Sequence, residues 1–182
     1  MPNNIIITGG PGSGKSTLLT KLEQNGHHCV PEVSRQLIQQ QTVLGSNCVP
    51  WNDLNCFARL SLDKMILDYN TADQTDTISF FDRGIPDVIA YLKAGYLPVD
   101  PLFYDVAEQY RYESFVYIAP PWKEIYVNDN ERWQTFEEAC VLYEMLVSVY
   151  SDLRYNIIEL PLVPVKERVD FVLKTLPSVK SY

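Results

Sequence analysis

Short apolar runs alternate with longer amphipathic segments along this chain. The apolar runs are rich in β-branched or aromatic residues and end at turn residues, a pattern typical of strands buried on both faces. Strands are predicted at 5–7, 29–30, 77–81, 115–118 and 156–160. Between them, apolar residues recur three and four positions apart, which predicts helices at 17–24, 33–44, 52–69, 86–93, 133–150 and 165–176.

This alternation of strands and helices predicts an α/β fold. Parallel strands need crossover connections, and a helix in each connection covers one face of the sheet or the other. We therefore expect a five-stranded parallel sheet with helices on both faces, a three-layer arrangement, in a single domain spanning residues 1–182. A chain of 182 residues buries about 70% of its unfolded surface, so it needs no metal or disulfide for stability.

The composition narrows the class of protein. Apolar residues make up 46% and charged residues 21%, which is ordinary for a folded chain and excludes disordered and fibrous classes. The net charge of −8 argues against nucleic-acid and membrane-surface partners, although it leaves room for one local anion site. No apolar stretch approaches the roughly 20 residues of a membrane span, and the N-terminus lacks the basic start of a signal peptide. We therefore expect a cytoplasmic protein.

The cysteines carry little functional signal. None forms a CxxC pair and the two histidines are adjacent, so a zinc site is not expected. Two disulfides are arithmetically possible. Because we expect a non-secreted protein, buried free thiols are favoured for Cys29, Cys48, Cys56 and Cys140.

A glycine-rich motif opens the chain. Residues 9–16, GGPGSGKS, fit GxxxxGK[ST] in full, after a strand and before a helix, which is the context that a phosphate-binding P-loop requires. Backbone N–H groups of such a loop and the helix N-terminus cradle phosphate oxygens. We assign Lys15 to the β- and γ-phosphates, Ser16 to Mg²⁺ and Thr17 to packing or the α-phosphate. The predicted nucleotide-binding residues are Gly9, Gly10, Pro11, Gly12, Ser13, Gly14, Lys15, Ser16 and Thr17.

Charged residues follow the third predicted strand. Asp82 ends the apolar run 77–81, and such an acid binds Mg²⁺ in many P-loop proteins; the alternative is a cap on the next helix. Arg83 is a candidate clamp for the transferring phosphoryl group or a second substrate, and a salt bridge to Asp82 or Asp87 is its alternative. Ligands bind beyond the carboxyl ends of parallel strands, so both residues stand where chemistry is expected.

Glu32 follows the second strand. A carboxylate there is suited to accept a proton from an attacking hydroxyl, and its alternative is a first-turn glutamate favoured by the helix dipole. Arg35, one turn later, pairs with Glu32 or binds substrate. Asp87 is a second candidate for substrate contact.

A polar segment at about 121–132 follows the fourth strand and is predicted to be a lid that closes over phosphates. Arg132 is its candidate phosphate contact, with Lys123 second, and a solvated loop is the alternative. Trp51 and Trp122 lie at loop edges, where they can stack on a ring, although structural roles are the commoner ones for such residues. By analogy with such folds, the backbone of 161–164 is expected to receive the base.

Together these motifs resemble the P-loop ATPase and kinase domains of the NadR-like group, which includes the nicotinamide riboside kinase part of NadR. The resemblance covers essentially the whole chain and is carried by the P-loop, PEVSR at 31–35, FDRG at 81–84 with Asp87, and the lid with Arg132. The chain is also similar to deoxyribonucleoside kinases, in which a Glu after the second strand acts as base and an acid–Arg pair after the third serves metal and phosphoryl group. Gly84 departs from that pattern, where nucleoside kinases usually carry Ser.

The resemblance implies a P-loop NTPase fold of the nucleotide-kinase type, with ATP and Mg²⁺ as cofactors. The leading hypothesis is a small-molecule kinase whose acceptor is a nucleoside, a nicotinamide riboside-like compound or another small alcohol, in a monomer or homodimer. The alternative is a nucleotide-dependent regulatory ATPase or switch that acts on a protein partner. The sequence lacks the NKxD motif of GTPases and the LSGGQ-like signature of ABC proteins, and it is too short for the separate helical domain of strict AAA+ proteins.

Overall fold

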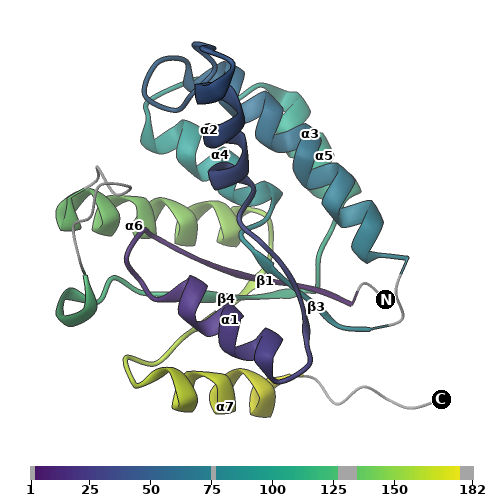
Figure 1. The fold of residues 1–182 in the computed structure, drawn as a ribbon, viewed down its shortest axis with the longest axis vertical. Helices are drawn as coiled ribbons and strands as arrows, with labels where there is room; N and C mark the ends of the chain where they lie inside the picture. Colours follow the sequence, from purple (N-terminus) through teal and green to yellow (C-terminus); the bar gives the residue numbers. More distant parts are fainter. Residues whose placement is uncertain (1–2, 75–76, 127–134, 177–182) are drawn as a thin grey trace.

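The computed structural model describes residues 3–74, 77–126 and 135–176, and these contain one five-stranded parallel sheet (Figure 1). The strand order is β2-β3-β1-β4-β5, and every pairing is parallel. The predicted sheet is confirmed, with β3 starting two residues later than the sequence pattern indicates. The strands are β1 (Asn4–Gly9), β2 (His28–Val30), β3 (Ser79–Asp82), β4 (Phe115–Ala119) and β5 (Asn156–Glu159).

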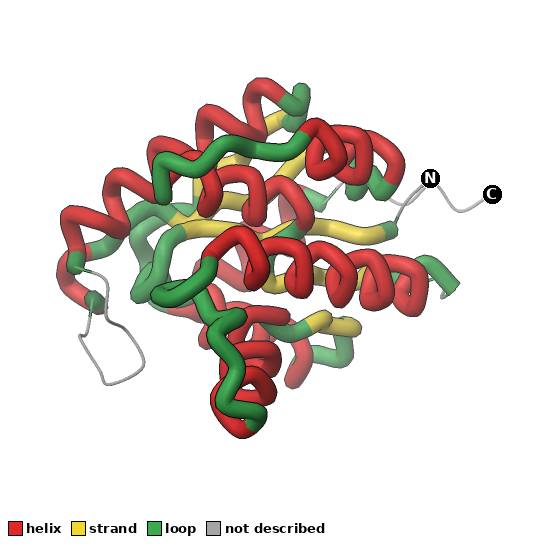
Figure 2. Tube along the Cα trace, turned by 90° about the horizontal axis from the view of Figure 1, so that it is seen from above, coloured by secondary structure: helices red, strands yellow, loops and turns green. Residues whose placement is uncertain are grey.

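Helices cover both faces of the sheet, so the predicted three-layer α/β fold is confirmed (Figures 1 and 2). On one face lie α1 (Lys15–Gln24) and α7 (Val165–Thr175). On the other lie α2 (Val33–Val43), α3 (Leu54–Ala72), α4 (Ile85–Ala94), α5 (Pro101–Gln109) and α6 (Phe136–Asp152). Within the described residues, no helix has the length and apolar content needed to cross a membrane.

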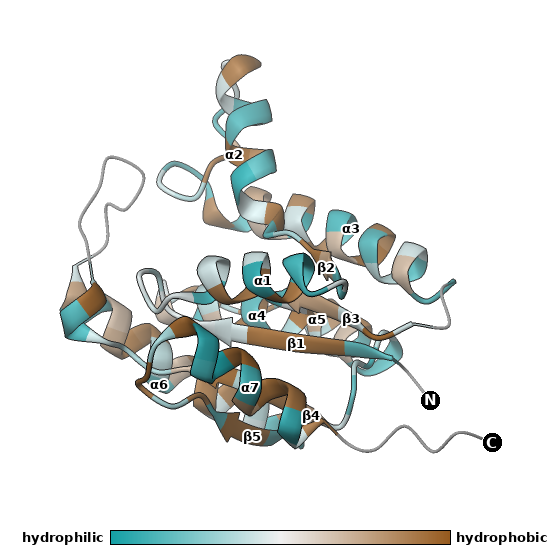
Figure 3. Cartoon of the chain, turned by 60° about the horizontal axis from the view of Figure 1, so that its bottom comes forward, coloured by the Kyte–Doolittle hydropathy of each residue, from teal (hydrophilic) through white to brown (hydrophobic). Residues whose placement is uncertain are grey.

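The apolar run of β1 supplies both halves of the core. Side chains alternate between the faces of a strand, so Ile6 joins the cluster under α4 and α6 while Ile5 and Ile7 join the cluster under α1 and α7. Figure 3 shows this strand as a central apolar ribbon with helices around it. An uninterrupted apolar strand is therefore required here, because neither face meets water.

One helix has no counterpart in the apolar pattern, which predicts nothing regular between residues 95 and 114. α5 begins at Pro101, and the N–H of Leu102 donates to the Asp100 side chain at 3.0 Å. Asp followed by Pro is a start signal in the sequence. The helix is only nine residues long and buries one short stripe, so its periodicity is weak.

The expectation of free thiols is wrong for two of the cysteines. Cys48 and Cys56 form a disulfide with their Cα atoms 5.3 Å apart, while Cys29 and Cys140 carry free, half-buried thiols. The loop between α2 and α3 folds back onto the first turn of α3, which brings the two residues together. Disulfides are rare in the cytosol, so this bond weighs against the cytoplasmic expectation.

Reducing this disulfide is expected to lower the free energy of unfolding by about 2 kcal/mol, because the bond restrains a short loop in the unfolded chain. Urea unfolding with and without a dithiol reductant measures the change. A Cys29→Ser/Cys140→Ser variant, which keeps the bond, is the control and should show the same shift on reduction. If reduction leaves the midpoint of the control and of the unaltered protein in place, Cys48 and Cys56 are not bonded in solution.

Candidate active site

The loop between β1 and α1 has the backbone of a phosphate cradle. Gly9, Gly12 and Gly14 have φ angles of +141°, +74° and +83°, which disfavour any residue with a Cβ. A Cβ on Gly12 would lie 2.6 Å from the ring of Tyr126, and one on Gly9 would lie 2.4 Å from the carbonyl oxygen of Ala119. The glycines of the motif are therefore needed for conformation and for close packing, independently of any ligand.

Lys15 is folded over this loop. Its Nζ donates to the carbonyl oxygens of Gly9 at 2.8 Å and Gly10 at 2.9 Å, and the side chain is buried. Burial and the nearby charge of Arg83 lower the pKa of Lys15 to about 8. Ser16 and Thr17 follow on the first turn of α1 and are exposed. The ammonium therefore lies at the mouth of the loop, where it can exchange these carbonyls for phosphate oxygens.

Nucleotide binding is expected to depend on pH above about pH 8, because phosphates raise the pKa of Lys15 from the value that it has in the free protein. Below that pH the ammonium is already charged and binding takes up no proton. Above it, binding takes up one proton and affinity falls by at most about tenfold per pH unit. Calorimetric titration with ADP at about pH 7 and pH 9, in buffers of different ionisation enthalpy, measures the uptake.

The matched control for this titration is Lys21→Met, since Lys21 lies on the same helix but is exposed, and its Nζ donates to Gln24 Oε1 at 3.1 Å. This variant should show the same proton uptake as the unaltered protein. Binding at pH 9 without proton uptake would contradict the assignment of Lys15.

Glu32 and Arg83 meet at the edge of the sheet, because β2, β3 and β1 are neighbours in it. Arg83 Nε donates to Glu32 Oε1 at 3.0 Å, and Arg83 Nη1 donates to the Gly9 carbonyl oxygen at 2.8 Å. Arg35 lies on the other side of Glu32, with its Nε 3.8 Å from Oε2. Burial alone would raise the pKa of Glu32, but the charges of Arg83 and Lys15 outweigh it and lower this pKa to about 2. Glu32 is therefore ionised in the free protein.

Asp82 presents a buried, unused oxygen. Among the described residues its Oδ1 has no hydrogen-bond partner, and burial raises the pKa of the carboxyl against the opposing charge of Lys15. The described part of the chain holds no cluster of three or more His, Cys, Asp or Glu residues. Mg²⁺ is commonly held by one or two protein oxygens together with phosphate oxygens, so the orphaned Oδ1 and the exposed Ser16 hydroxyl fit that ion.

Asp87 is more deeply enclosed than its position after the strand suggests. Its carboxylate accepts hydrogen bonds from the hydroxyls of Thr8 and Tyr150 and from the Gly84 N–H, and it lies 3.6 Å from Arg83 Nη1. The side chain is 1% exposed. Of the two salt-bridge partners considered for Arg83, Asp82 and Asp87, the structure pairs it with Asp87, and it adds a second ion pair with Glu32.

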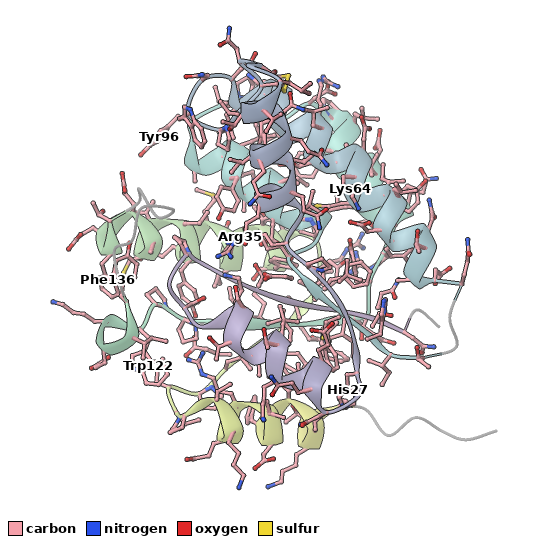
Figure 4. The ribbon with its side chains drawn as sticks, in the orientation of Figure 1. His27, Arg35, Lys64, Tyr96, Trp122 and Phe136 are labelled. Carbon is pink, nitrogen blue, oxygen red and sulfur yellow. A yellow bond between two sulfur atoms is a disulfide. The ribbon has the colours of Figure 1, made fainter. Side chains whose placement is uncertain are left out.

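A cavity of about 870 Å³ joins these residues. One part of it is polar and is lined by the P-loop and by Glu32, Arg35, Arg83 and Asp87. Figure 4 shows Arg35 below α2, in the space between that helix and the P-loop. The other part is largely apolar and is lined by α2, the disulfide-closed loop, α3 and α4, including Ile38, Trp51, Leu54, Phe57, Met65 and Tyr91. The predicted helix at 52–69 thus contributes to the wall.

A second cavity of about 280 Å³ lies behind the P-loop. It is lined by Trp122 and by residues 163–165, so it adjoins the loop that is expected to receive a base. Arg168 closes it: Nη1 donates to the Ser13 carbonyl at 2.8 Å, Nε donates to the Pro161 carbonyl at 2.9 Å, and Cζ lies 4.8 Å from the Trp122 ring centroid. Figure 4 shows Trp122 beside α7.

Sequence reasoning missed Arg168, although one signal was present. The residue stands at helical spacing with Val165, Val169 and Val172, so it is a cation on an otherwise apolar helix face. What its guanidinium does there depends on carbonyls far away in the sequence, which no local pattern reveals.

The predicted lid is only partly within the structure. Arg132 and residues 127–131 lie outside the described residues. Of the rest, Lys123–Ile125 form a short 3₁₀ helix, η1, and the Tyr126 ring lies 5.5 Å from that of Phe136 in an edge-to-face contact. Lys123 is exposed.

A sequence-family model described as an AAA domain matches residues 4–168. The chain belongs to this AAA domain family. The match runs from β1 into α7 and so spans the sheet and the site described above. The match does not bear on whether the protein has the separate helical domain of strict AAA+ proteins. No curated protein is detectably similar to the chain in sequence.

Solved structures of kinases share this fold. The NadR protein in complex with NR superposes with a TM-score of 0.72 at 18% identity, covering 100% of this chain and 54% of NadR, so the chain spans about half the length of that protein. Deoxyadenosine kinase from M. mycoides with bound dATP superposes with a TM-score of 0.69 at 15% identity, covering 95% of this chain and 98% of the kinase. Thymidylate kinase from Ehrlichia chaffeensis superposes with a TM-score of 0.62 at 16% identity, covering 97% of this chain and 100% of that kinase. The chain therefore has the P-loop kinase fold, and the predicted resemblance to NadR-like domains and deoxyribonucleoside kinases is confirmed.

Proposed function

We propose that this protein is an ATP-dependent small-molecule kinase that transfers the γ-phosphoryl group to a hydroxyl of a nucleoside-like or nicotinamide riboside-like acceptor. The observation that carries the proposal is the continuous cavity from the P-loop, past Glu32 and Arg83, into an apolar chamber under α3. A kinase needs such a space for its acceptor, because water must be kept from the γ-phosphate. The bound NR and dATP of the structural neighbours suggest the ligand classes.

The phosphates of ATP are placed on the P-loop residues 9–17, with Lys15 between the β- and γ-phosphates. Mg²⁺, held by Ser16 and Asp82, would neutralise phosphate charge when bound. Arg83 and Arg132 are assigned to the transferring group, and Arg35 and Asp87 to the neighbourhood of the acceptor. Catalysis is then mainly positioning and charge neutralisation.

Glu32 receives the proton of the acceptor hydroxyl. With a pKa of about 2 in the free protein it is a weak base. Phosphoryl transfer passes through a loose transition state in which the hydroxyl loses its proton late, so a weak but well-placed base suffices. An acceptor hydroxyl beside Glu32 also competes with Arg83 for its oxygens, which raises the basicity of the carboxylate as transfer begins.

The base of the nucleotide belongs in the second cavity. An aromatic face at Trp122 and the apolar residues 163–165 suit a planar ring, and Arg168 ties this wall to the P-loop through Ser13. The missing NKxD motif favours adenine over guanine there.

A regulatory ATPase or switch is the second candidate. It would use the same P-loop but needs an exposed face that changes with the nucleotide, whereas the large apolar chamber has no role in it. We therefore rank it below the kinase, and we retain the single-domain and monomer-or-homodimer expectations as parts of the proposal.

A thermal-shift screen tests the function. The protein is incubated with Mg²⁺ and ATP or GTP, and with nucleosides, nicotinamide riboside and nucleoside monophosphates, because any ligand of the native state raises its stability by mass action. Stabilisation by Mg-ATP and by one acceptor, followed by transfer of labelled γ-phosphate to it, supports the kinase. Stabilisation by Mg-ATP alone, with hydrolysis but no transfer, supports the switch.

A further inference from the structure

The contacts of Asp87 give it a different role from direct substrate binding. We propose that Asp87 is a positioning residue that holds the Arg83 guanidinium toward the transferring phosphoryl group, and that Thr8 and Tyr150 fix its carboxylate for that purpose. The inference rests on the proposed function, because the role of Arg83 belongs to it.

Arg83 needs external support to hold its direction. Its φ angle is +74°, in the left-handed region that a residue with a long side chain rarely adopts, and the side chain is 5% exposed. Glu32, the Gly9 carbonyl and Asp87 surround its nitrogens, and the Tyr91 ring centroid lies 5.3 Å from Cζ. Asp87 and Tyr91 stand one and two helical turns beyond Arg83, on one side of α4.

These partners differ in what nucleotide and acceptor do to them. In the proposed reaction Glu32 receives the proton of the acceptor hydroxyl, and the Gly9 carbonyl belongs to the loop assigned to the phosphates. The contacts of Arg83 with Glu32 and with the Gly9 carbonyl are therefore expected to change during the reaction cycle. Asp87 is 1% exposed and accepts hydrogen bonds from Thr8, Gly84 and Tyr150, so it is the anion that remains beside Arg83 throughout.

The carboxylate of Asp87 is itself locked. Oδ1 accepts from the Thr8 hydroxyl and faces Arg83, while Oδ2 accepts from the Gly84 N–H at 2.9 Å and from the Tyr150 hydroxyl. A carboxylate offers about four acceptor sites; three of them accept hydrogen bonds here, and the remaining side of Oδ1 faces Arg83 Nη1 at 3.6 Å, so the carboxylate is largely occupied by protein groups. An occupied, immobile anion is suited to orient a cation and unsuited to bind a substrate hydroxyl.

The hydrogen bonds of Thr8 and Tyr150 to Asp87 connect elements whose relative positions the proposed reaction requires to be fixed. Thr8 is on β1, two residues before Gly10 of the P-loop, Asp87 is on α4, and Tyr150 is on α6, whose Val141 and Leu142 line the cavity. A single buried carboxylate thus sets Arg83 relative to the P-loop strand and the helix that borders the acceptor space.

Tyr150→Phe and Thr8→Val test the lock without removing the charge. Each deletes one hydroxyl and keeps the packing volume, so each should lower kcat about tenfold while KM for ATP stays within about twofold, since the loss falls on the transition state. Asp87→Asn should lower kcat by about 100-fold. Tyr155→Phe is the matched control, because it removes another buried tyrosine hydroxyl, from a ring that packs edge-on against Tyr150. It should leave kcat unchanged.

A second readout does not depend on activity. Solvent exchange of the Arg83 guanidinium Nη–H groups, one of which faces Asp87, followed by NMR and assigned with Arg83→Lys, should rise in Tyr150→Phe and Thr8→Val but not in Tyr155→Phe. If the unaltered protein neither transfers nor hydrolyses, the proposed function fails, and this exchange still tests the positioning. Exchange rates equal to those of the control overturn the inference. A raised acceptor KM with unchanged kcat in Tyr150→Phe also overturns it, because that result makes Asp87 a binding residue.

Discussion

Replacing Glu32 with glutamine is expected to lower phosphoryl transfer by about 10²- to 10⁴-fold, the range for loss of a general base, while ATP affinity stays within about threefold. Glutamine keeps the size of the side chain and can still accept one hydrogen bond from Arg83 Nε, which lies 3.0 Å away. It cannot accept the proton of an acceptor hydroxyl. Single-turnover transfer of labelled γ-phosphate measures the chemical step, and calorimetric titration measures nucleotide binding.

Glu137→Gln provides the matched control for this experiment. Glu137 is an exposed acid on the first turn of α6 that lines the same cavity, so the change removes an equal charge without touching the sheet edge. Its transfer rate should stay close to that of the unaltered protein. Unchanged transfer in Glu32→Gln would exclude this residue as the base. A loss of ATP affinity as large as the loss of rate would instead show that Glu32 acts only by holding Arg83 in place.

Replacing Lys15 with methionine is expected to lower turnover by about 10²- to 10³-fold, and to weaken nucleotide binding as well, because a preorganised cation at the phosphates is lost. Methionine has a similar length and no charge. The loop also loses the two hydrogen bonds from Nζ to the Gly9 and Gly10 carbonyls. Binding of ADP and the rate of ATP turnover are the two measurements.

Lys21→Met is again the appropriate control, since it removes a charge from the same helix at an exposed position. It should leave both quantities unchanged. Turnover by Lys15→Met at the rate of the control would show that the P-loop does not serve the reaction. A stability loss in Lys15→Met large enough to unfold the protein is not expected, because burial disfavours the charged ammonium, as the lowered pKa of Lys15 shows, and methionine carries no such cost.

The Cys48–Cys56 disulfide and the role of Arg168 are two features that the sequence did not predict. Cys48 and Cys56 are eight residues apart, and that spacing is equally compatible with two thiols. Only the path of the α2–α3 loop brings their Cα atoms within bonding range. Arg168 is visible in the sequence as a cation on an apolar helix face, but its partners, the carbonyls of Ser13 and Pro161, come from other elements.

The sequence by itself determined the features that depend on neighbouring residues. The P-loop is one continuous stretch whose glycine positions and helix start are set by local backbone geometry, and β-branched runs such as 5–7 specify buried strands. Parallel topology then implied that Glu32, Asp82 and Arg83 share the edge of the sheet with the P-loop, because they follow its strands directly.

The tertiary structure alone decided which of those charges pair. The order β2-β3-β1 sets Arg83 against Glu32 and Gly9, and the packing of α4 against α6 brings Tyr150 to Asp87. Neither arrangement leaves a periodic or spacing signal, because each depends on contacts between residues 50 to 80 positions apart. Which charged and hydroxyl groups meet across such sequence separations depends on how the helices pack on the sheet. That packing is a property of the folded chain.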